Sequence, residues 1–133
     1  MIRVEVVTPK GIVFSNDVTS VNIPTVEGEI GVLEKHMYLM TLLKPGLLYF
    51  DGKQENGFAV TYGFVDVTPT KVIVLAEEAY PIGSIDPGRE KELFDEAVKK
   101  LATATTVEEY EEYLRQMERA RTLLELVERF GNL

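Results

Sequence analysis

The sequence predicts a chain of two parts: an N-terminal antiparallel β-sandwich or barrel over residues 1–83, and an antiparallel two-helix hairpin over residues 84–133. Three observations carry this prediction. Short runs of alternating apolar and polar residues fill the first part, with turn signals between them. No helical pattern interrupts those runs. From residue 84 the apolar residues recur at steps of three and four, the period of an amphipathic helix.

Strands are expected where apolar residues alternate and a turn signal follows. The first strand runs from Ile2 to Thr8 and ends at Pro9-Lys10-Gly11. We expect the other strands over residues 12–14, 18–23, 28–33, 38–43, 47–50, 58–62, 64–67 and 71–75. In this interpretation Ser15-Asn16-Asp17 is a turn that closes the second strand. Many short strands with regular turns are typical of an antiparallel sandwich or barrel.

The first helix is expected to begin after Asp86, an N-cap residue, with Pro87 at the first helical position, where a missing N–H costs nothing. One apolar face is predicted for it, made of Leu93, Phe94, Ala97, Val98 and Leu101. A small-residue connector follows, and then Thr106 and Glu109 form a capping box.

A heptad-like seam defines the second helix. It comprises Tyr113, Met117, Ala120, Leu124 and Val127, widened by Tyr110, Leu114, Leu123 and Phe130. Gly131 and Asn132 are predicted to cap its end. The short link between two amphipathic helices predicts an antiparallel hairpin, which could be detachable because two helices alone bury little.

Composition excludes several functional classes. The formal net charge is -8, from 14 basic and 22 acidic side chains, so phosphate repulsion argues against nucleic-acid binding. The chain has no cysteine and one histidine, which excludes thiolate chemistry and metal sites with several histidine ligands. The N-terminal residues lack the pattern of a signal peptide, and no apolar run could cross a bilayer. We therefore expect a soluble cytoplasmic protein.

The sequence contains few residue patterns that indicate a catalytic site, so the chain is predicted not to be an enzyme. Glu27 and Glu29 could share one face of a strand as paired carboxylates do, although a solvated strand face gives the same spacing. His36 could be a general base, but no Ser in the chain has the setting of a nucleophile. A surface or interface role for this histidine is the simpler hypothesis.

The stretch from Pro24 to His36 is the part around which the chain is organised. Taken with Leu42-Leu43-Lys44-Pro45-Gly46, with Gly63-Phe64-Val65-Asp66-Val67 and with Val72-Ile73-Val74-Leu75-Ala76, it resembles the epsilon subunit of the bacterial rotary ATP synthase. Val7-Thr8-Pro9 followed by Gly11 fits as well. The resemblance covers most of the N-terminal part in order and spacing, and the helical hairpin follows where that family has one.

The resemblance implies a central-stalk subunit of a proton-translocating ATP synthase. Its partners would be the gamma subunit, the c-ring of the membrane sector and, through the hairpin, the catalytic beta subunits, where the hairpin inhibits ATP hydrolysis. Glu29, Gly31 and His36 fall where the family contacts the c-ring and gamma. The expected place is peripheral, on the cytoplasmic face of the bacterial plasma membrane, without insertion into the bilayer.

Three arginines of the second helix, Arg115, Arg119 and Arg129, are predicted to lie near one face, opposite much of the apolar seam. In an extended hairpin they could meet an acidic segment of a catalytic subunit. The alternative is solvated pairing within the helix, with Glu111, Glu112 and Glu125.

No cofactor is expected, with ATP as a regulatory ligand the one alternative. Some family members bind ATP through an Ile/Leu-Asp-x-x-Arg-Ala motif, which Asp86 and Arg89 match until Glu90 replaces the alanine. Further arginines of that site fall at Glu96 and Glu112, whose carboxylates would repel phosphate. Asp86 also has a complete role as an N-cap.

A different functional class stays open on the residues alone. A free-standing β-sandwich could bind a carbohydrate or peptide and dimerise through its hairpin. Such a module needs an exposed aromatic platform. Its candidates are Tyr38, Tyr49, Phe50, Phe58, Tyr62 and Phe64, and the strand patterns place at least half of them in the core.

Overall fold

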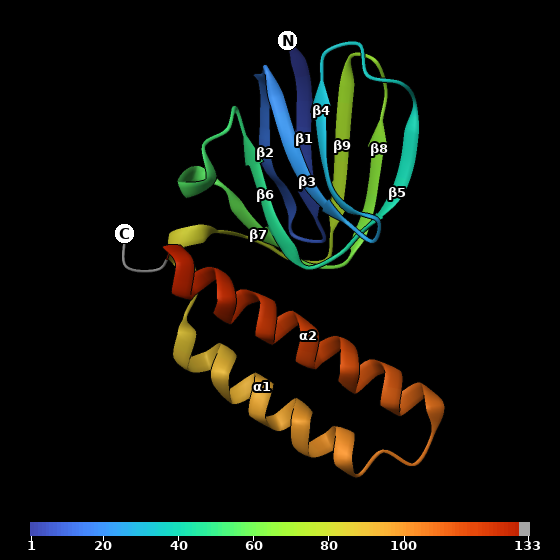
Figure 1. The fold of residues 1–133 in the computed structure, drawn as a ribbon, viewed down its shortest axis with the longest axis vertical. Coiled ribbons are helices and arrows are strands. Elements are labelled where there is room, and N and C mark those ends of the chain that lie inside the picture. Colours follow the sequence, from blue (N-terminus) through green and yellow to red (C-terminus); the bar gives the residue numbers. More distant parts are fainter. Residues whose placement is uncertain (131–133) are drawn as a thin grey trace. The chain divides into compact units, whose positions relative to one another are not determined.

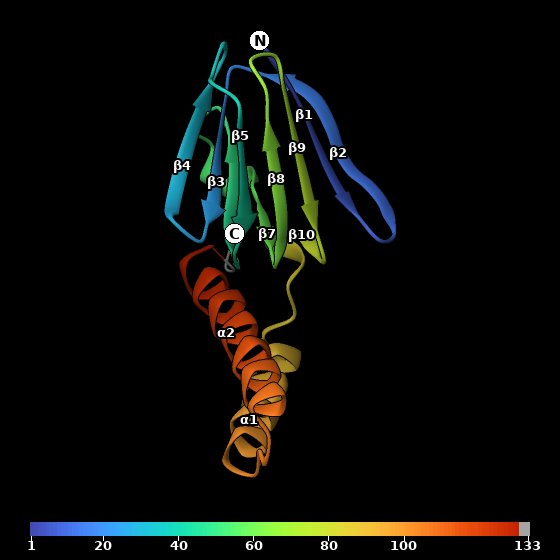
Figure 2. The same ribbon diagram turned by 90° about the vertical axis from the view of Figure 1, so that its right-hand side faces the viewer.

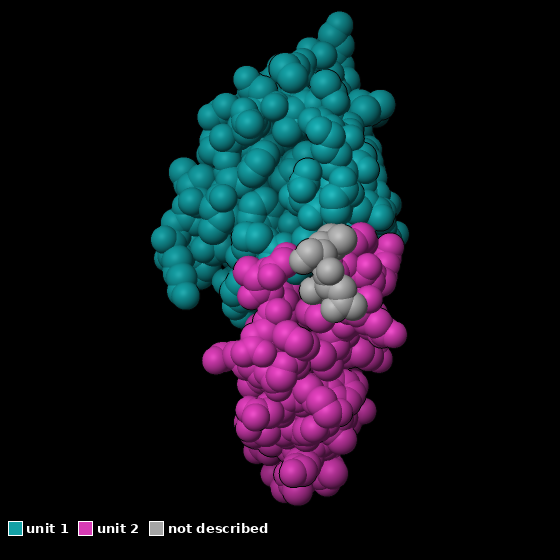
Figure 3. Space-filling view, turned by 90° about the vertical axis from the view of Figure 1, so that its left-hand side faces the viewer, with its two compact units in different colours: residues 1–82 teal, residues 83–133 magenta. Residues whose placement is uncertain are grey.

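The computed structural model describes residues 1–130. It divides into two compact units, Met1–Ile82 and Gly83–Leu133, coloured separately in Figure 3. The first unit holds all the strands of the described residues, and the second holds the two α-helices.

A ten-stranded sheet forms the first unit and curls into a sandwich (Figures 1 and 2). Its strands are β1 (Ile2–Thr8), β2 (Gly11–Val18), β3 (Ser20–Thr25), β4 (Gly28–Leu33), β5 (Leu39–Leu43), β6 (Gly46–Phe50), β7 (Phe58–Val60), β8 (Gly63–Val67), β9 (Lys71–Ala76) and β10 (Ala79–Pro81). The order across the sheet is β10-β7-β6-β3-β5-β8-β9-β1-β2, and β4 pairs with β3 beside this path. The predicted sandwich is confirmed.

Period-two alternation builds the core. In β1 the side chains of Ile2, Val4 and Val6 are buried while those between them are not, as expected for a strand with one face inward. In β9 Val72 and Val74 are buried in the same way. These two strands pair in parallel, with Val4 beside Val72 and Val6 beside Val74. The parallel pair joins the first strand to one far along the chain.

The predicted turn at residues 15–17 is wrong, because β2 continues through it to Val18. β1 supplies antiparallel partners for all three residues, with one register shift between Val6 and Val7. Arg3 holds two of the polar side chains, donating to the Ser15 hydroxyl at 2.8 Å and pairing with Asp17 at 3.5 Å. Turn-forming residues are tolerated here because β2 is an edge strand.

Other boundaries differ where a short element leaves little pattern. The expected strand over residues 58–62 ends at Val60, and a new strand begins at Gly63. Strand β10 and the 3-10 helices η1 (Gln54–Asn56) and η2 (Ile82–Ser84) were not predicted. β3 extends through Pro24, which lies opposite Glu29 on β4.

A side chain fixes the turn that follows β6. Asp51 has a positive φ of 53°, and its Oδ1 atom accepts from the Thr19 hydroxyl at 2.6 Å, the Thr19 amide at 2.8 Å and the Ser20 amide at 3.2 Å. These hydrogen bonds, the Thr19 hydroxyl foremost, lower the pKa of the Asp51 carboxyl below its ordinary value of 3.8.

The second unit is a pair of helices, α1 (Pro87–Ala102) and α2 (Val107–Phe130), joined by a short turn. The Asp86 side chain accepts from the amides of Gly88 at 3.0 Å and Arg89 at 3.3 Å, so the predicted N-cap is correct. Thr106 Oγ1 accepts from the Glu109 amide at 3.1 Å, while the Glu109 carboxylate accepts from Thr105. The predicted C-terminal cap at residues 131–132 lies outside the described residues.

The buried stripe of the hairpin is displaced from the predicted seam. On α2 the buried residues are Ala120, Leu123 and Leu126; the prediction put Leu123 at the margin and omitted Leu126. On α1 Ala97 is buried, whereas Val98 is exposed, against the prediction. Spacing alone locates the apolar side of a helix only to within about one residue position, because side chains on either flank of the stripe share the same period.

Candidate interaction surfaces

The described residues contain no group of three or more acidic or histidine side chains placed to hold a metal ion. Within residues 1–130 no helix combines the length and the apolar character needed to cross a bilayer. The features that remain are surface patches and contacts between the two helices, most of them at or beside the predicted residues.

An apolar row crosses the outer face of the first unit. The register places five side chains side by side, one from each of five neighbouring strands: Leu42, Phe64, Leu75, Val7 and Ile12. Residues in register point to the same side of a sheet, and the row spans roughly 19 Å at the usual strand spacing. Phe64 keeps 55% of its surface exposed, and Leu42 and Leu75 keep 48% each.

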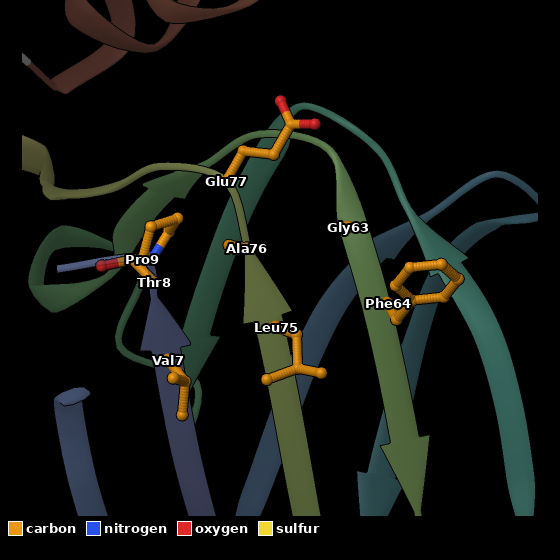
Figure 4. Close-up of a pocket in the computed structure, with 8 residues that line it drawn as sticks. All are labelled: Val7, Thr8, Pro9, Gly63, Phe64, Leu75, Ala76 and Glu77. Atoms are coloured by element: carbon orange, nitrogen blue, oxygen red, sulfur yellow. The ribbon is translucent and has the colours of Figure 1, made fainter. Parts of the chain in front are cut away.

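A shallow pocket of about 360 Å³ opens along this apolar row (Figure 4). Val7, Phe64 and Leu75 line it. Its shape depends on Gly63, because a Cβ atom on this residue would lie 1.8 Å from the Leu75 carbonyl oxygen. Any larger residue at that position would push β8 away from β9. The pocket therefore offers a preformed depression to an apolar side chain of a partner.

An exposed row of this kind on a small protein marks a surface that another molecule covers. The sequence analysis missed it, although the signal was present. The runs Leu39-Met40-Thr41-Leu42-Leu43 and Val72-Ile73-Val74-Leu75-Ala76 are apolar at both parities. Such runs indicate strands with two covered faces, of which the core accounts for only one.

Glu29 lies on β4 with its side chain exposed, while Ile30 next to it packs against the core, as alternation predicted. Its carboxylate accepts from Asn22 Nδ2 at 3.5 Å and from the Tyr49 hydroxyl at 3.4 Å. Gly31 has room for a side chain, since an added Cβ would meet only Asn22 Nδ2 at 3.6 Å. Glu27 lies in the turn before β4, so the two glutamates do not share one strand face.

His36 lies in the loop after β4, where its Nδ1 atom donates to the Met37 carbonyl at 2.8 Å. The loop is tied to the β8–β9 turn by the Lys35 amide, which donates to the Pro69 carbonyl at 2.9 Å. The N-terminal ammonium pairs with Glu34 at 3.0 Å and lowers the pKa of that carboxyl. Glu29 and His36 belong to opposite ends of β4, roughly 13 Å of strand apart, so they form no single site.

The prediction that the three arginines of α2 lie near one face, opposite much of the seam, is wrong. Arg119 faces α1 and forms a bidentate ion pair with Glu90, whose Oε2 atom lies 3.3 Å from Nη2. Arg115 and Arg129 are exposed, and the Arg129 guanidinium lies 5.0 Å from the Phe130 ring centroid. The pair with Glu90 differs from both predicted arrangements of Arg119, which were a face shared with the other two arginines and solvated pairing with Glu111, Glu112 or Glu125.

The residues of the expected ATP motif have other partners. Asp86 caps α1, Arg89 is exposed at the start of that helix, and Glu90 is buried with 4% exposure. The Glu90 carboxylate thus stands between the helices with Arg119, where a phosphate would need uncompensated positive charge.

Comparison with known proteins identifies relatives. The family model described as ATP synthase, Delta/Epsilon chain, beta-sandwich domain matches residues 1–82. The chain is 51% identical over 131 residues to the ATP synthase epsilon chain of Hydrogenobaculum sp. (strain Y04AAS1), covering 98% of this chain and 96% of that protein. It is 66% identical over 105 residues to the ATP synthase epsilon chain of Aquifex aeolicus (strain VF5), covering 78% and 80%.

Two solved structures share the fold. A chain of the Euglena gracilis mitochondrial ATP synthase superposes with a TM-score of 0.79 at 24% identity, covering 95% of this chain and 81% of that one. A chain of the Tetrahymena thermophila mitochondrial ATP synthase gives a TM-score of 0.64 at 15% identity, covering 93% and 94%. The predicted sandwich followed by two helices is therefore an architecture already seen in experimental structures.

Proposed function

The chain belongs to the ATP synthase epsilon-chain family, and from this premise we propose that it links the gamma subunit to the c-ring in the rotor, while its hairpin restrains ATP hydrolysis. The chain is a non-catalytic subunit of a membrane-associated complex, as its sequence resemblance to this family implied. We propose that the subunit is peripheral to the membrane, on the cytoplasmic face of the plasma membrane.

The apolar row is the observation that carries the proposal. Five side chains in register on a sheet face, with a depression among them, suit a large and permanent partner. We assign this face to the gamma subunit, which must hold the sandwich firmly for torque to pass through it. The two solved neighbours come from assemblies described as F1 with c-ring and as central stalk with c-ring, which supports a place in the rotor.

The start of β4 is assigned to the second partner. Glu29 presents a carboxylate beside the β3–β4 turn, and a carboxylate can form charge-assisted hydrogen bonds with basic loops of a c-ring. Gly31, on the same strand, and His36, in the loop at its other end, are proposed as separate points of contact with the ring and with gamma. Arg115, Arg119 and Arg129 are the proposed contacts of an extended hairpin with acidic segments of the beta subunits.

Reconstitution tests the proposal. The purified chain should bind the gamma subunit one to one and lower the ATP hydrolysis of a complex of alpha, beta and gamma subunits. A chain cut after Pro81 should still bind gamma but no longer lower hydrolysis. Self-association without gamma binding would instead support the free-standing module that dimerises through its hairpin.

A further inference from the structure

The one buried carboxylate among the described residues lies between the two helices. Glu90 is 4% exposed and belongs to the first turns of α1, close to its N-cap. Both of its oxygens accept from the Arg119 guanidinium of α2, in a bidentate arrangement. Buried charges are tolerated only when paired in this way. This ion pair therefore joins α1 to α2 in the closed hairpin.

The position of this pair in the hairpin matters. Glu90 and Arg119 lie equally far in sequence from the turn that joins α1 to α2, so they face each other at one level. That level is close to the start of α1, far from the turn. The pair thus joins the helices at the open end of the hairpin, where separation would begin.

The energetics of the pair differ from those of an apolar contact. Closing the hairpin removes two charges from water, and their mutual attraction roughly balances that desolvation. Apolar residues of similar size at the same positions would stabilise the closed hairpin, because their burial is favourable and no charged group has to be dehydrated. The rest of the buried stripe is small, with Ala97 on α1 and three residues on α2.

We propose that the Glu90–Arg119 ion pair is an electrostatic latch that keeps the hairpin closed yet easy to open. Opening rehydrates both charges, which offsets part of the lost apolar burial, and it releases Arg119 from Glu90. This inference deepens the proposed function, in which an opened hairpin presents arginines to the beta subunits. The latch is nevertheless a property of the chain by itself.

Two variants shift the equilibrium in opposite directions. Glu90→Gln removes the buried negative charge that faces the Arg119 guanidinium, so the ratio of open to closed hairpin should rise about tenfold or more. Glu90→Leu combined with Arg119→Met replaces the pair by apolar side chains, so the same ratio should fall below that of the unmodified chain. Glu92→Gln is the matched control, because it removes an exposed carboxylate of the same helix.

Spin labels can measure the opening. The chain has no cysteine, so Lys91→Cys and Arg121→Cys supply two exposed labelling positions, one on each helix. The distance distribution between the two labels, measured by double electron–electron resonance in the full-length chain, should shift to longer distances and broaden for Glu90→Gln. It should stay short and narrow for the double variant. Circular dichroism of each variant checks that both helices are retained.

Several outcomes would overturn the latch. One is an unchanged distance distribution for Glu90→Gln relative to Glu92→Gln, and another is a shift of both test variants in the same direction. Helix loss in Glu90→Gln alone would show that the carboxylate holds α1 and not the hairpin. Because no gamma subunit is present, a failed latch leaves the proposed function standing, and failed gamma binding leaves the latch standing.

Discussion

Replacing Phe64 in the apolar row should weaken binding to the gamma subunit and leave the sandwich intact. Full burial of a phenylalanine side chain stabilises a complex by about 1.5–3 kcal/mol. Since 55% of Phe64 is still exposed in the free chain, about 1–1.5 kcal/mol remains to be gained on binding. Phe64→Ala should therefore raise the dissociation constant about 5- to 13-fold. Phe64→Glu should raise it further, because a carboxylate would be buried without a partner.

Titration calorimetry of the purified chain with the gamma subunit measures this change. Val26→Glu is the control: it introduces the same charge at a residue with 57% exposure, in the β3–β4 turn, which the proposal assigns to the c-ring. Urea unfolding should show one cooperative transition for all three variants, with a modestly lower midpoint for the two Phe64 variants, because part of this side chain is already buried in the free chain. Gamma binding of Phe64→Glu at unmodified strength would refute the assignment of the row.

Three further predictions concern a close backbone approach, a turn carboxylate and the contact between the two helices. Gly63→Ala should lower the free energy of unfolding by roughly 3 kcal/mol, because its Cβ would overlap a carbonyl of β9; Gly83→Ala, with no atom within 4 Å, should be nearly neutral, and equal urea midpoints for the two would contradict the close approach. The lowered pKa of Asp51 implies a stabilising contribution that is present above its ordinary value of 3.8 and is lost as the pH falls through the lower folded value. The stability advantage over Asp51→Asn should accordingly shrink below about pH 4, and an advantage that persists in acid would disprove the role of the Thr19 hydroxyl. Calorimetric titration with millimolar ATP should show no saturable binding, because the Glu90 carboxylate stands where phosphate would need positive charge; a saturable heat that Arg89→Ala abolishes would reverse this expectation.

The two-part fold could be predicted because periodicity reports which face of an element is buried. Alternation in β1 and the N-cap at Asp86 both gave the element that the structure contains. Edges were harder to predict. Ser15, Asn16 and Asp17 resemble a turn in composition, yet an exposed edge strand accepts them because β1 satisfies their backbone.

The surfaces were less predictable, because they depend on contacts between residues far apart in sequence. Register between strands creates the apolar row, and no local pattern states which strands are neighbours. The same holds for Arg119, whose partner Glu90 comes from the other helix. Counting acidic residues within α2 could not reveal that pair. By contrast, the family resemblance was visible, since its motifs are local and lie in the sandwich.

Isolation of the complex from native membranes tests the central claim most directly. A tag on this chain should recover the gamma subunit, the c-ring and the catalytic subunits, with one copy of the chain per complex by quantitative mass spectrometry. Recovery of the chain alone, or as a dimer without gamma and the c-ring, would contradict its assignment to the rotor.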